Sequence, residues 1–168
     1  IFVYLGKHLN QTMVLIDENT NASYEGIIKR VEDAETLKGN KDFTFEWHKE
    51  TGSEIYKLTI KGKKEILGLL SIRDIGKEFR VHINLIESSI KHRGKKNGLR
   101  NIPGCLIGFT CRIAFRKGYG GFVSLTPKTY LIDYYQNNYG FIQVGRQLAT
   151  YGENSKSLMT KYLDDEEI

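Results

Sequence analysis

The stretch "HRGKKNGLRNIPGCLIGFTC", from His92 to Cys111, joins two kinds of sequence. Its first half is basic and contains glycine, and its second half, after Pro103, is largely apolar. Runs of alternating apolar and polar residues before it indicate strands, and within it the apolar period changes to that of a helix. A helix start offers unpaired N–H groups and a positive dipole end, which attract anions. The stretch therefore predicts either an anion-binding loop or a solvated turn before a buried helix.

The chain before this loop predicts an antiparallel meander. Four alternating runs with short turns between them indicate four consecutive strands. These runs are residues 43–47, 53–60, 65–75 and 78–88. In the first of them, Phe43, Phe45 and Trp47 are expected on one face of a strand. Residues 1–9 fit a further short strand, and residues 27–37 fit either a helix or a strand.

After the loop, the pattern predicts helices that alternate with strands. Apolar residues between Asn101 and Lys117 form a stripe broad enough for a helix that lies against a sheet. Asn101 is the expected N-cap, and Gly118 follows the helix end. The remaining segments are a strand at 121–125, a helix at 127–138, a strand at 139–150 and a helix at 154–163. The predicted class is α+β, with a helix crossing between two neighbouring strands of a mostly antiparallel sheet.

Length and composition narrow the class of protein. A chain of 168 residues predicts a single domain over residues 1–168. No apolar run approaches the roughly 18 residues of a membrane span, and no secretory signal is visible, so we expect a cytoplasmic protein without membrane contact. The sequence begins at Ile1, which leaves room for a missing upstream segment. Cys105 and Cys111 lack metal-ligand spacing, so we expect reduced core thiols and no metal site.

The charge of the chain is +5, although residues 164–167 are all acidic. A basic body suits either nucleic acid or a phosphorylated small ligand. Residues 91–100 hold five cations and no acid, and glycines there allow a close backbone approach to a ligand. The ten tyrosines do not interleave with this basic cluster, and no RNA-binding motif is present. Specific nucleic-acid binding is therefore not expected.

The order of elements around the basic loop resembles the GNAT acetyltransferase superfamily. The resemblance covers roughly residues 43–163 and is best in the central helix and in the segment Pro127 to Phe141, where tyrosines precede Gly-Phe. It implies an acyl-CoA N-acyltransferase fold, with a splay between two neighbouring strands of a central sheet and helices on both faces. The family loop Arg/Gln-x-x-Gly-x-Gly/Ala is here Arg100-Asn101-Ile102-Pro103-Gly104-Cys105. The proline removes one N–H donor from this loop.

The resemblance implies an acetyl-CoA-dependent N-acetyltransferase that transfers the acetyl group directly to an unidentified amine, either a small molecule or a peptide. In the family, backbone N–H groups of the loop bind the pyrophosphate, and the end of the preceding strand pairs with the pantetheine arm. The residues implied to bind acetyl-CoA are Ser88, Ser89, Ile90, Arg93, Gly94, Lys95, Lys96, Gly98, Arg100, Asn101 and Gly104. A homodimer is compatible with the sequence.

The resemblance also implies two catalytic residues. Glu87 lies where many family members place a carboxylate base, and the alternative is a polar residue at a strand end. The family's thiolate acid is a tyrosine at the position of Gln136, so the adjacent Tyr135 is the candidate, with a core tyrosine as the alternative. His82 is expected to be structural. For the whole chain, the altered loop supports a catalytically inactive binding or interaction protein as one alternative. A nucleic-acid-binding domain is the other.

Overall fold

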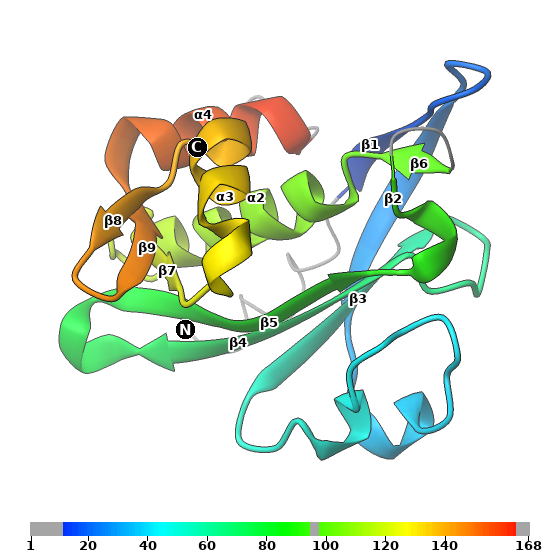
Figure 1. The fold of residues 1–168 in the computed structure, drawn as a ribbon, viewed down its shortest axis with the longest axis horizontal. Helices are drawn as coiled ribbons and strands as arrows, with labels where there is room; N and C mark the ends of the chain where they lie inside the picture. The colour runs from blue at the N-terminus through cyan, green and yellow to red at the C-terminus, as the bar shows by residue number, and fades with distance from the viewer. Residues whose placement is uncertain (1–11, 95–97, 164–168) are drawn as a thin grey trace.

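The computed structural model describes residues 12–94 and 98–163, and its centre is one nine-stranded sheet (Figure 1). The strand order is β6-β1-β2-β3-β4-β5-β7-β9-β8. The strands are β1 (Thr12–Asp17), β2 (Ser23–Arg30), β3 (Glu54–Ile60), β4 (Gly68–Ile75), β5 (Arg80–Ser88), β6 (Leu99–Arg100), β7 (Val123–Leu125), β8 (Ile142–Val144) and β9 (Gln147–Thr150). Neighbouring strands are antiparallel except β5 and β7, which run parallel. The predicted α+β class is confirmed.

The meander consists of β2 to β5. Three of the four predicted runs become β3, β4 and β5, and β2 takes the place before them. Alternation in β3 places Tyr56 and Leu58 in the main core and Ile55 in a second cluster on the other face, so both faces of the sheet are covered. Residues 27–37 divide between β2 and a 3-10 turn, η1 (Ala34–Leu37). The strand predicted at residues 1–9 lies outside the described residues.

Residues 43–47 do not form the predicted strand. Phe43 and Trp47 are buried in the second cluster, whereas Phe45 is 39% exposed. The backbone N–H groups of Thr44 and Phe45 donate to the carboxylate of Glu87 rather than to a neighbouring strand. The alternating pattern therefore arises because Phe43 and Trp47 are buried on an irregular segment. The side chain of Glu87 satisfies backbone N–H groups of this segment. This segment and the 3-10 turn η2 (Trp47–Lys49) cover the sheet face opposite to α2 and α4 (Figure 1).

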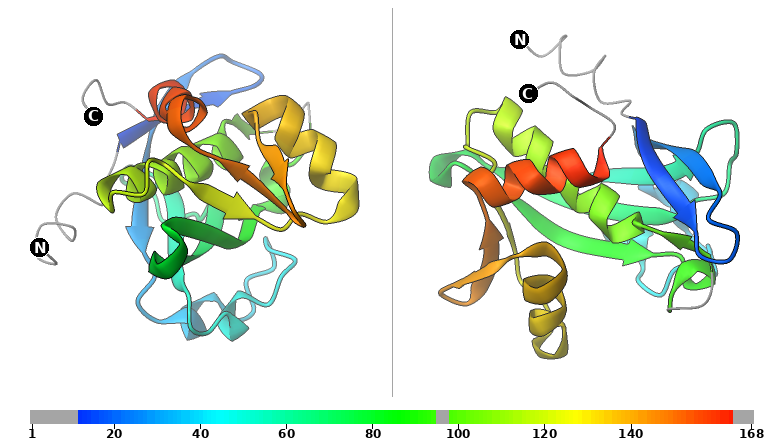
Figure 2. Two further views of the ribbon diagram at one scale, coloured as in Figure 1. Left: turned by 90° about the vertical axis from the view of Figure 1, so that its left-hand side faces the viewer. Right: turned by 90° about the horizontal axis from the view of Figure 1, so that it is seen from above.

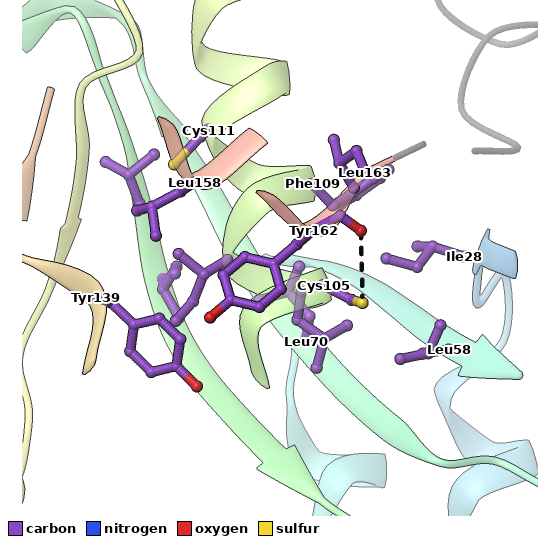
Figure 3. Close-up of a cluster of buried hydrophobic side chains, with 14 of the residues drawn as sticks. Ile28, Leu58, Leu70, Cys105, Phe109, Cys111, Tyr139, Leu158, Tyr162 and Leu163 are labelled. Atoms are coloured by element: carbon purple, nitrogen blue, oxygen red, sulfur yellow. Dashed lines mark hydrogen bonds between the residues drawn. The ribbon is translucent and has the colours of Figure 1, made fainter. Parts of the chain in front are cut away.

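Helix α2 (Ile102–Arg116) confirms the predicted central helix and packs on β4, β5 and β7. Helix α4 (Gly152–Tyr162) lies against α2 on the side away from the sheet, as both views in Figure 2 show. Gly104 and Gly108, one turn apart on α2, leave room for Tyr162 and for the backbone of Leu158. Figure 3 shows the resulting core, in which Cys105 contacts the Tyr162 carbonyl at 3.8 Å.

The C-terminal part departs from the prediction at residues 139–150. The single strand expected there is a hairpin, because Gly145 adopts φ 63° and turns the chain between β8 and β9. The helix predicted at 127–138 consists of a 3-10 turn, η5 (Thr129–Leu131), followed by α3 (Ile132–Tyr139). The hairpin inserts β9 between β7 and β8, which sets the strand order at this end of the sheet.

Candidate active site

The candidate site lies where β5 and β7 separate. The two strands pair from Val81↔Val123 to Ile83↔Leu125. Beyond these pairs β5 continues, whereas the segment after β7 turns away at Pro127. Proline has no N–H and cannot extend the ladder. Opposite β4, the register shifts so that Asn84 is an extra residue in β5. Such a bulge bends a strand and increases its twist. The predicted splay is therefore confirmed. It has two local causes, which are Pro127 after β7 and the bulge at Asn84 in β5.

A cleft of about 680 Å³ occupies this opening. Below it is called the β5–β7 cleft. Its lining residues are Thr44, Phe45, Ile83, Asn84, Leu85, Ile86, Glu87, Ser88, Arg93, Leu125, Thr126, Pro127, Lys128, Tyr130, Leu131, Tyr134 and Tyr135. Ile86 packs against the main core on the face of α2, and Leu85 packs against the second cluster on the opposite face. Because side chains from both faces line it, the cleft reaches both sides of the sheet, and two ligands can meet in it.

The carboxylate of Glu87 lines this cleft but is fully engaged by the protein. It accepts hydrogen bonds from the N–H groups of Thr44 (2.6 Å) and Phe45 (3.2 Å) and from the indole of Trp47 (2.9 Å). The guanidinium of Arg93 forms an ion pair with it as well. The residue is only 6% exposed. This arrangement anchors residues 44–47 to β5, and its carboxylate oxygens already have four donors.

Tyr135 lines the cleft together with Tyr134, and its role as the thiolate acid stays a prediction. Burial, and next the neighbouring Tyr134, raise the pKa of Tyr135 to about 12, so its phenol stays protonated at neutral pH. Tyr134 is 38% exposed, and its hydroxyl lies 3.2 Å from that of Tyr139. Burial raises the pKa of Tyr139 further, and its ring packs 6.2 Å from that of Tyr162 (Figure 3). A chain of tyrosines thus leads from the cleft to α4.

The cations of the basic loop form ion pairs with acidic residues from other segments of the chain. Lys91 lies 3.5 Å from Asp42 and 3.9 Å from Glu65. Arg100 pairs with Glu18 at 3.3 Å. Together with the pairing of Arg93, each cation that the structure describes between residues 91 and 100 has an acidic partner. Lys95 and Lys96 lie outside the described residues, so their predicted role is not tested.

The small residues of the loop have different surroundings. Ser89 is buried, and its hydroxyl accepts the N–H of Lys91 at the start of the turn η4 (Ile90–His92). Ser88 lines the cleft, and Ile90 is half exposed outside it. Gly94 has open space at its α-carbon. A side chain at Gly98 would overlap His92, whose Nδ1 accepts the N–H of Leu99 at 3.1 Å. Of the predicted donor-binding residues that the structure describes, only Ser88 and Arg93 line the cleft.

The start of α2 is closed by its own neighbours. Asn101 has φ 75° and makes no side-chain cap, and its amide lies 3.5 Å from the Val14 carbonyl. Gly104 is buried beneath the ring of Tyr162, so the absence of a side chain there serves helix packing. With Pro103 lacking an N–H, this first turn differs from the open anion site that the sequence predicts.

Most of the cleft residues were not predicted from the sequence as site residues, and Thr44, Phe45 and Lys128 are among them. Phe45 and Thr44 come from a segment about forty residues before Glu87, and Lys128 follows the end of β7. The Nζ of Lys128 lies 5.4 Å from the centre of the Phe45 ring. Lys128 directly follows the proline that ends the β5–β7 pairing, which is the one signal in the sequence that marks this position. His82, expected to be structural, lies 2.8 Å from the buried hydroxyl of Ser124.

No protein-family profile matches the chain, and no curated protein matches it. Within the described residues, no helix has the length and apolar character to cross a membrane, and no three side chains of His, Cys, Asp or Glu cluster as metal ligands.

Solved structures do resemble the chain. A cAMP-binding acyltransferase from Mycobacterium smegmatis aligns with a TM-score of 0.54 at 11% identity, over 88% of this chain and 50% of that one. The chain thus spans about half the length of the mycobacterial protein. Tetrahymena GCN5 aligns with a TM-score of 0.46 at 11% identity, over 62% of this chain and 71% of that one. Nourseothricin acetyltransferase aligns with a TM-score of 0.42 at 15% identity, over 86% of both chains.

Identities this low establish a fold and nothing finer. The sheet contains one parallel pair, a helix crosses between the two strands of that pair, and the strands separate beyond a bulge. The chain has the fold of the GNAT acyltransferases.

Proposed function

We propose that the protein is an acyl-CoA-dependent N-acyltransferase that moves an acetyl group from acetyl-CoA to an amine. The observation that carries this proposal is the β5–β7 cleft, which reaches both faces of the sheet at the one parallel strand pair. A thioester can enter along the edge of β5, and an amine can approach it from the other face. Direct transfer needs this arrangement, because both reactants must be held together in one site.

The cleft can accommodate the acyl-bearing arm of acetyl-CoA. The start of α2 is less suited to binding the pyrophosphate of acetyl-CoA. Beyond Ile83, the backbone of β5 faces the cleft without a partner from β7, and this edge can pair with the amide groups of a pantetheine arm. Ser88 and Arg93 lie at the end of this edge. The first turn of α2 is covered by Tyr162, so we assign the main contacts of the donor to the β5 edge.

In the transfer step, the amine nitrogen attacks the thioester carbonyl. A C–N bond forms, the C–S bond breaks, and the sulfur leaves as a thiolate, while the nitrogen releases a second proton that the thiolate takes up through solvent. The phenol of Tyr135 is the proposed hydrogen-bond donor to that sulfur. An ordinary thiol has a pKa of about 8.5, well below the value of about 12 for Tyr135, so the phenol stabilises the thiolate by a hydrogen bond rather than by full proton transfer.

The attacking amine must lose a proton before or during the attack. The prediction that Glu87 is the base remains open to test, but four donors already occupy its carboxylate. We therefore propose that Glu87 is a positioning residue, which holds residues 44–47 against the cleft. In this arrangement, water in the open cleft takes the proton from the ammonium.

The alternative is a GNAT-like binding protein without catalysis. The observation that favours it is the start of α2, where Pro103 and the buried Gly104 replace an open glycine loop. Such a protein would bind a ligand in the cleft without releasing CoA. A nucleic-acid-binding domain has less support, because the described cations of the basic loop are paired with acids.

Two measurements on the wild-type chain test the proposal. Trp47 is the sole tryptophan and is bonded to Glu87 behind the cleft, so acetyl-CoA should change its fluorescence saturably. Release of the CoA thiol should then depend on an added amine. Ser88→Phe, which fills the cleft, should abolish both signals, whereas Ser157→Phe on the exposed side of α4 should leave them unchanged. Binding of acetyl-CoA without release of the CoA thiol for any amine favours the non-catalytic alternative. Absence of binding refutes acetyl-CoA as the donor.

A further inference from the structure

The acceptor side of the β5–β7 cleft has an unusual charge balance. Among the described residues that line the cleft, the charged side chains are Arg93, Lys128 and Glu87. The carboxylate of Glu87 is buried and bonded to four donors, one of which is Arg93. No described carboxylate lies within ion-pair distance of Lys128. Among the described residues, a ligand in the cleft therefore meets an ammonium group without an acidic partner and no unengaged acid.

The same wall also carries exposed aromatic rings. Phe45, Tyr130 and Tyr134 are 39%, 76% and 38% exposed, although large apolar side chains are normally buried. All three line the cleft, and the Nζ of Lys128 lies 5.4 Å from the centre of the Phe45 ring. Exposed aromatic side chains that converge on one cleft with a few polar groups are typical of a small-molecule site.

These two observations exclude one kind of acceptor and favour another. A polyamine or a lysine-rich peptide brings several positive charges, which Lys128 repels, and the carboxylate of the described lining acid Glu87 is already engaged by four donors. An amine that carries a carboxylate can pair with Lys128, while an apolar side chain packs on the rings. We propose that the acceptor is a small carboxylate-bearing amine of the aromatic amino-acid type, with its carboxylate held by Lys128 and its side chain against Phe45 and Tyr130. This proposal rests on the proposed function, whose site it deepens.

The test compares two acceptors that differ only in the carboxylate, phenylalanine and phenethylamine, with spermidine as the polycation. The value of kcat/KM should be highest for phenylalanine and lowest for spermidine. The two aromatic amines also differ in the ordinary pKa of their ammonium groups, so the preference of the wild type alone is not diagnostic. Lys128→Gln should reduce the ratio of phenylalanine to phenethylamine by roughly three- to tenfold, as expected for one partly solvated ion pair.

A matched control separates this effect from a general loss of charge. Lys161 on α4 also lies over a tyrosine ring, 5.2 Å from the centre of Tyr162, and does not line the cleft. Lys161→Gln should keep the wild-type ratio. The affinity of Lys128→Gln for acetyl-CoA should also be unchanged. A loss of acetyl-CoA affinity with an unaltered acceptor ratio overturns the proposal, because Lys128 would then serve the donor phosphates.

Failure of the inference can be told apart from failure of the proposed function. Preferential acetylation of spermidine or phenethylamine upholds the transferase and refutes the carboxylate-bearing acceptor. If no amine is acetylated, the transferase proposal fails, and binding decides the inference. Phenylalanine should then still change the fluorescence of Trp47 at lower concentration than phenethylamine does, and Lys128→Gln should remove that difference. Equal binding of the two compounds by the wild type refutes the inference in that case.

Discussion

Two adjacent tyrosines line the same cleft in different surroundings. Tyr135 is buried, and Tyr134 is partly exposed with its hydroxyl near that of Tyr139. If Tyr135 stabilises the departing thiolate, Tyr135→Phe should lower kcat by about 10²-fold and leave the Kd of acetyl-CoA nearly unchanged, since one transition-state donor is lost. Tyr134→Phe is the matched control and should retain most of the rate. The reverse ranking in single-turnover measurements would assign the role to Tyr134.

Glu87 provides a test of positioning against general base catalysis. Glu87→Gln replaces one acceptor oxygen by an NH2 group, which then faces either the N–H of Thr44 and the guanidinium of Arg93 or the N–H of Phe45 and the indole N–H of Trp47. Arg93 is 42% exposed, so solvent screens the ion pair and most of the loss comes from the buried hydrogen bonds. We expect the free energy of unfolding to fall by about 2–3 kcal/mol.

The control for Glu87 is a surface carboxylate on the same segment. Glu46→Gln removes the partner of Lys49 in an exposed pair and should leave stability nearly unchanged. Urea unfolding followed by Trp47 fluorescence measures both variants. A Glu87→Gln protein of normal stability whose rate has fallen by a factor of 10²–10⁴ would establish Glu87 as the base.

At the scale of elements, the contact of α2 with α4 depends on two glycines. A Cβ at Gly104 would overlap the ring of Tyr162, whereas one at Gly108 would lie 3.2 Å from the carbonyl oxygen of Leu158. Both changes to alanine raise helix propensity by the same amount, so their difference isolates packing. We expect Gly104→Ala to be less stable than Gly108→Ala by about 1–3 kcal/mol in urea unfolding. Tyr162→Leu should reduce that difference, and an unchanged difference would place the strain elsewhere.

The elements also differ in how well the sequence predicts them. Helix α2 was predictable because its apolar stripe is long, and β3 to β5 because short turns separate regular runs. Residues 43–47 alternate equally well but have no neighbouring strand to accept their hydrogen bonds, and Glu87 accepts them from forty residues away. Local periodicity contains no information about that partner. The hairpin of β8 and β9 was missed because its turn is a single Gly145-Arg146 step inside an apolar run.

For the molecule as a whole, charge was the least predictable property. The loop from Lys91 to Arg100 contains only cations in sequence, yet Asp42, Glu65, Glu87 and Glu18 reach its described cations from other segments. The cleft has the same origin, since its walls come from residues near 44, 87 and 128. The resemblance to the GNAT superfamily implied the splay, which the structure confirms, and the role that it implies for Tyr135 stays a prediction. The sequence could not reveal that Lys128 lies beside Phe45, because only the folded chain brings these two residues together.

The buried thiols make the stability of the whole protein sensitive to alkali. Burial raises the pKa of both Cys105 and Cys111 to about 12. In the unfolded chain, thiols ionise near pH 8.5, so the folded state holds its protons more tightly. Their contribution to stability is therefore complete below pH 8.5 and is lost as the pH rises toward 12.

This prediction can be checked with a thiol reagent and with Tm. At pH 8, a disulfide reagent should fail to modify the native protein and should modify both cysteines in denaturant. The value of Tm should fall steadily from pH 9 to pH 11. Rapid labelling of the native protein at pH 8 would show that Cys105 and Cys111 are not buried in the core that Figure 3 shows.

The three-pair junction of β5 and β7 has a consequence for the order of folding. Each strand from β1 to β5 pairs with the next one in sequence, but Ile83 reaches Leu125 only after α2 has been laid across the sheet. Closing so long a loop is slow relative to forming hairpins. In refolding, the fluorescence of Trp47, which reports on the first half of the chain, should recover before the amide protons of β7 become protected from exchange. Simultaneous recovery would indicate that both halves of the sheet assemble in one step.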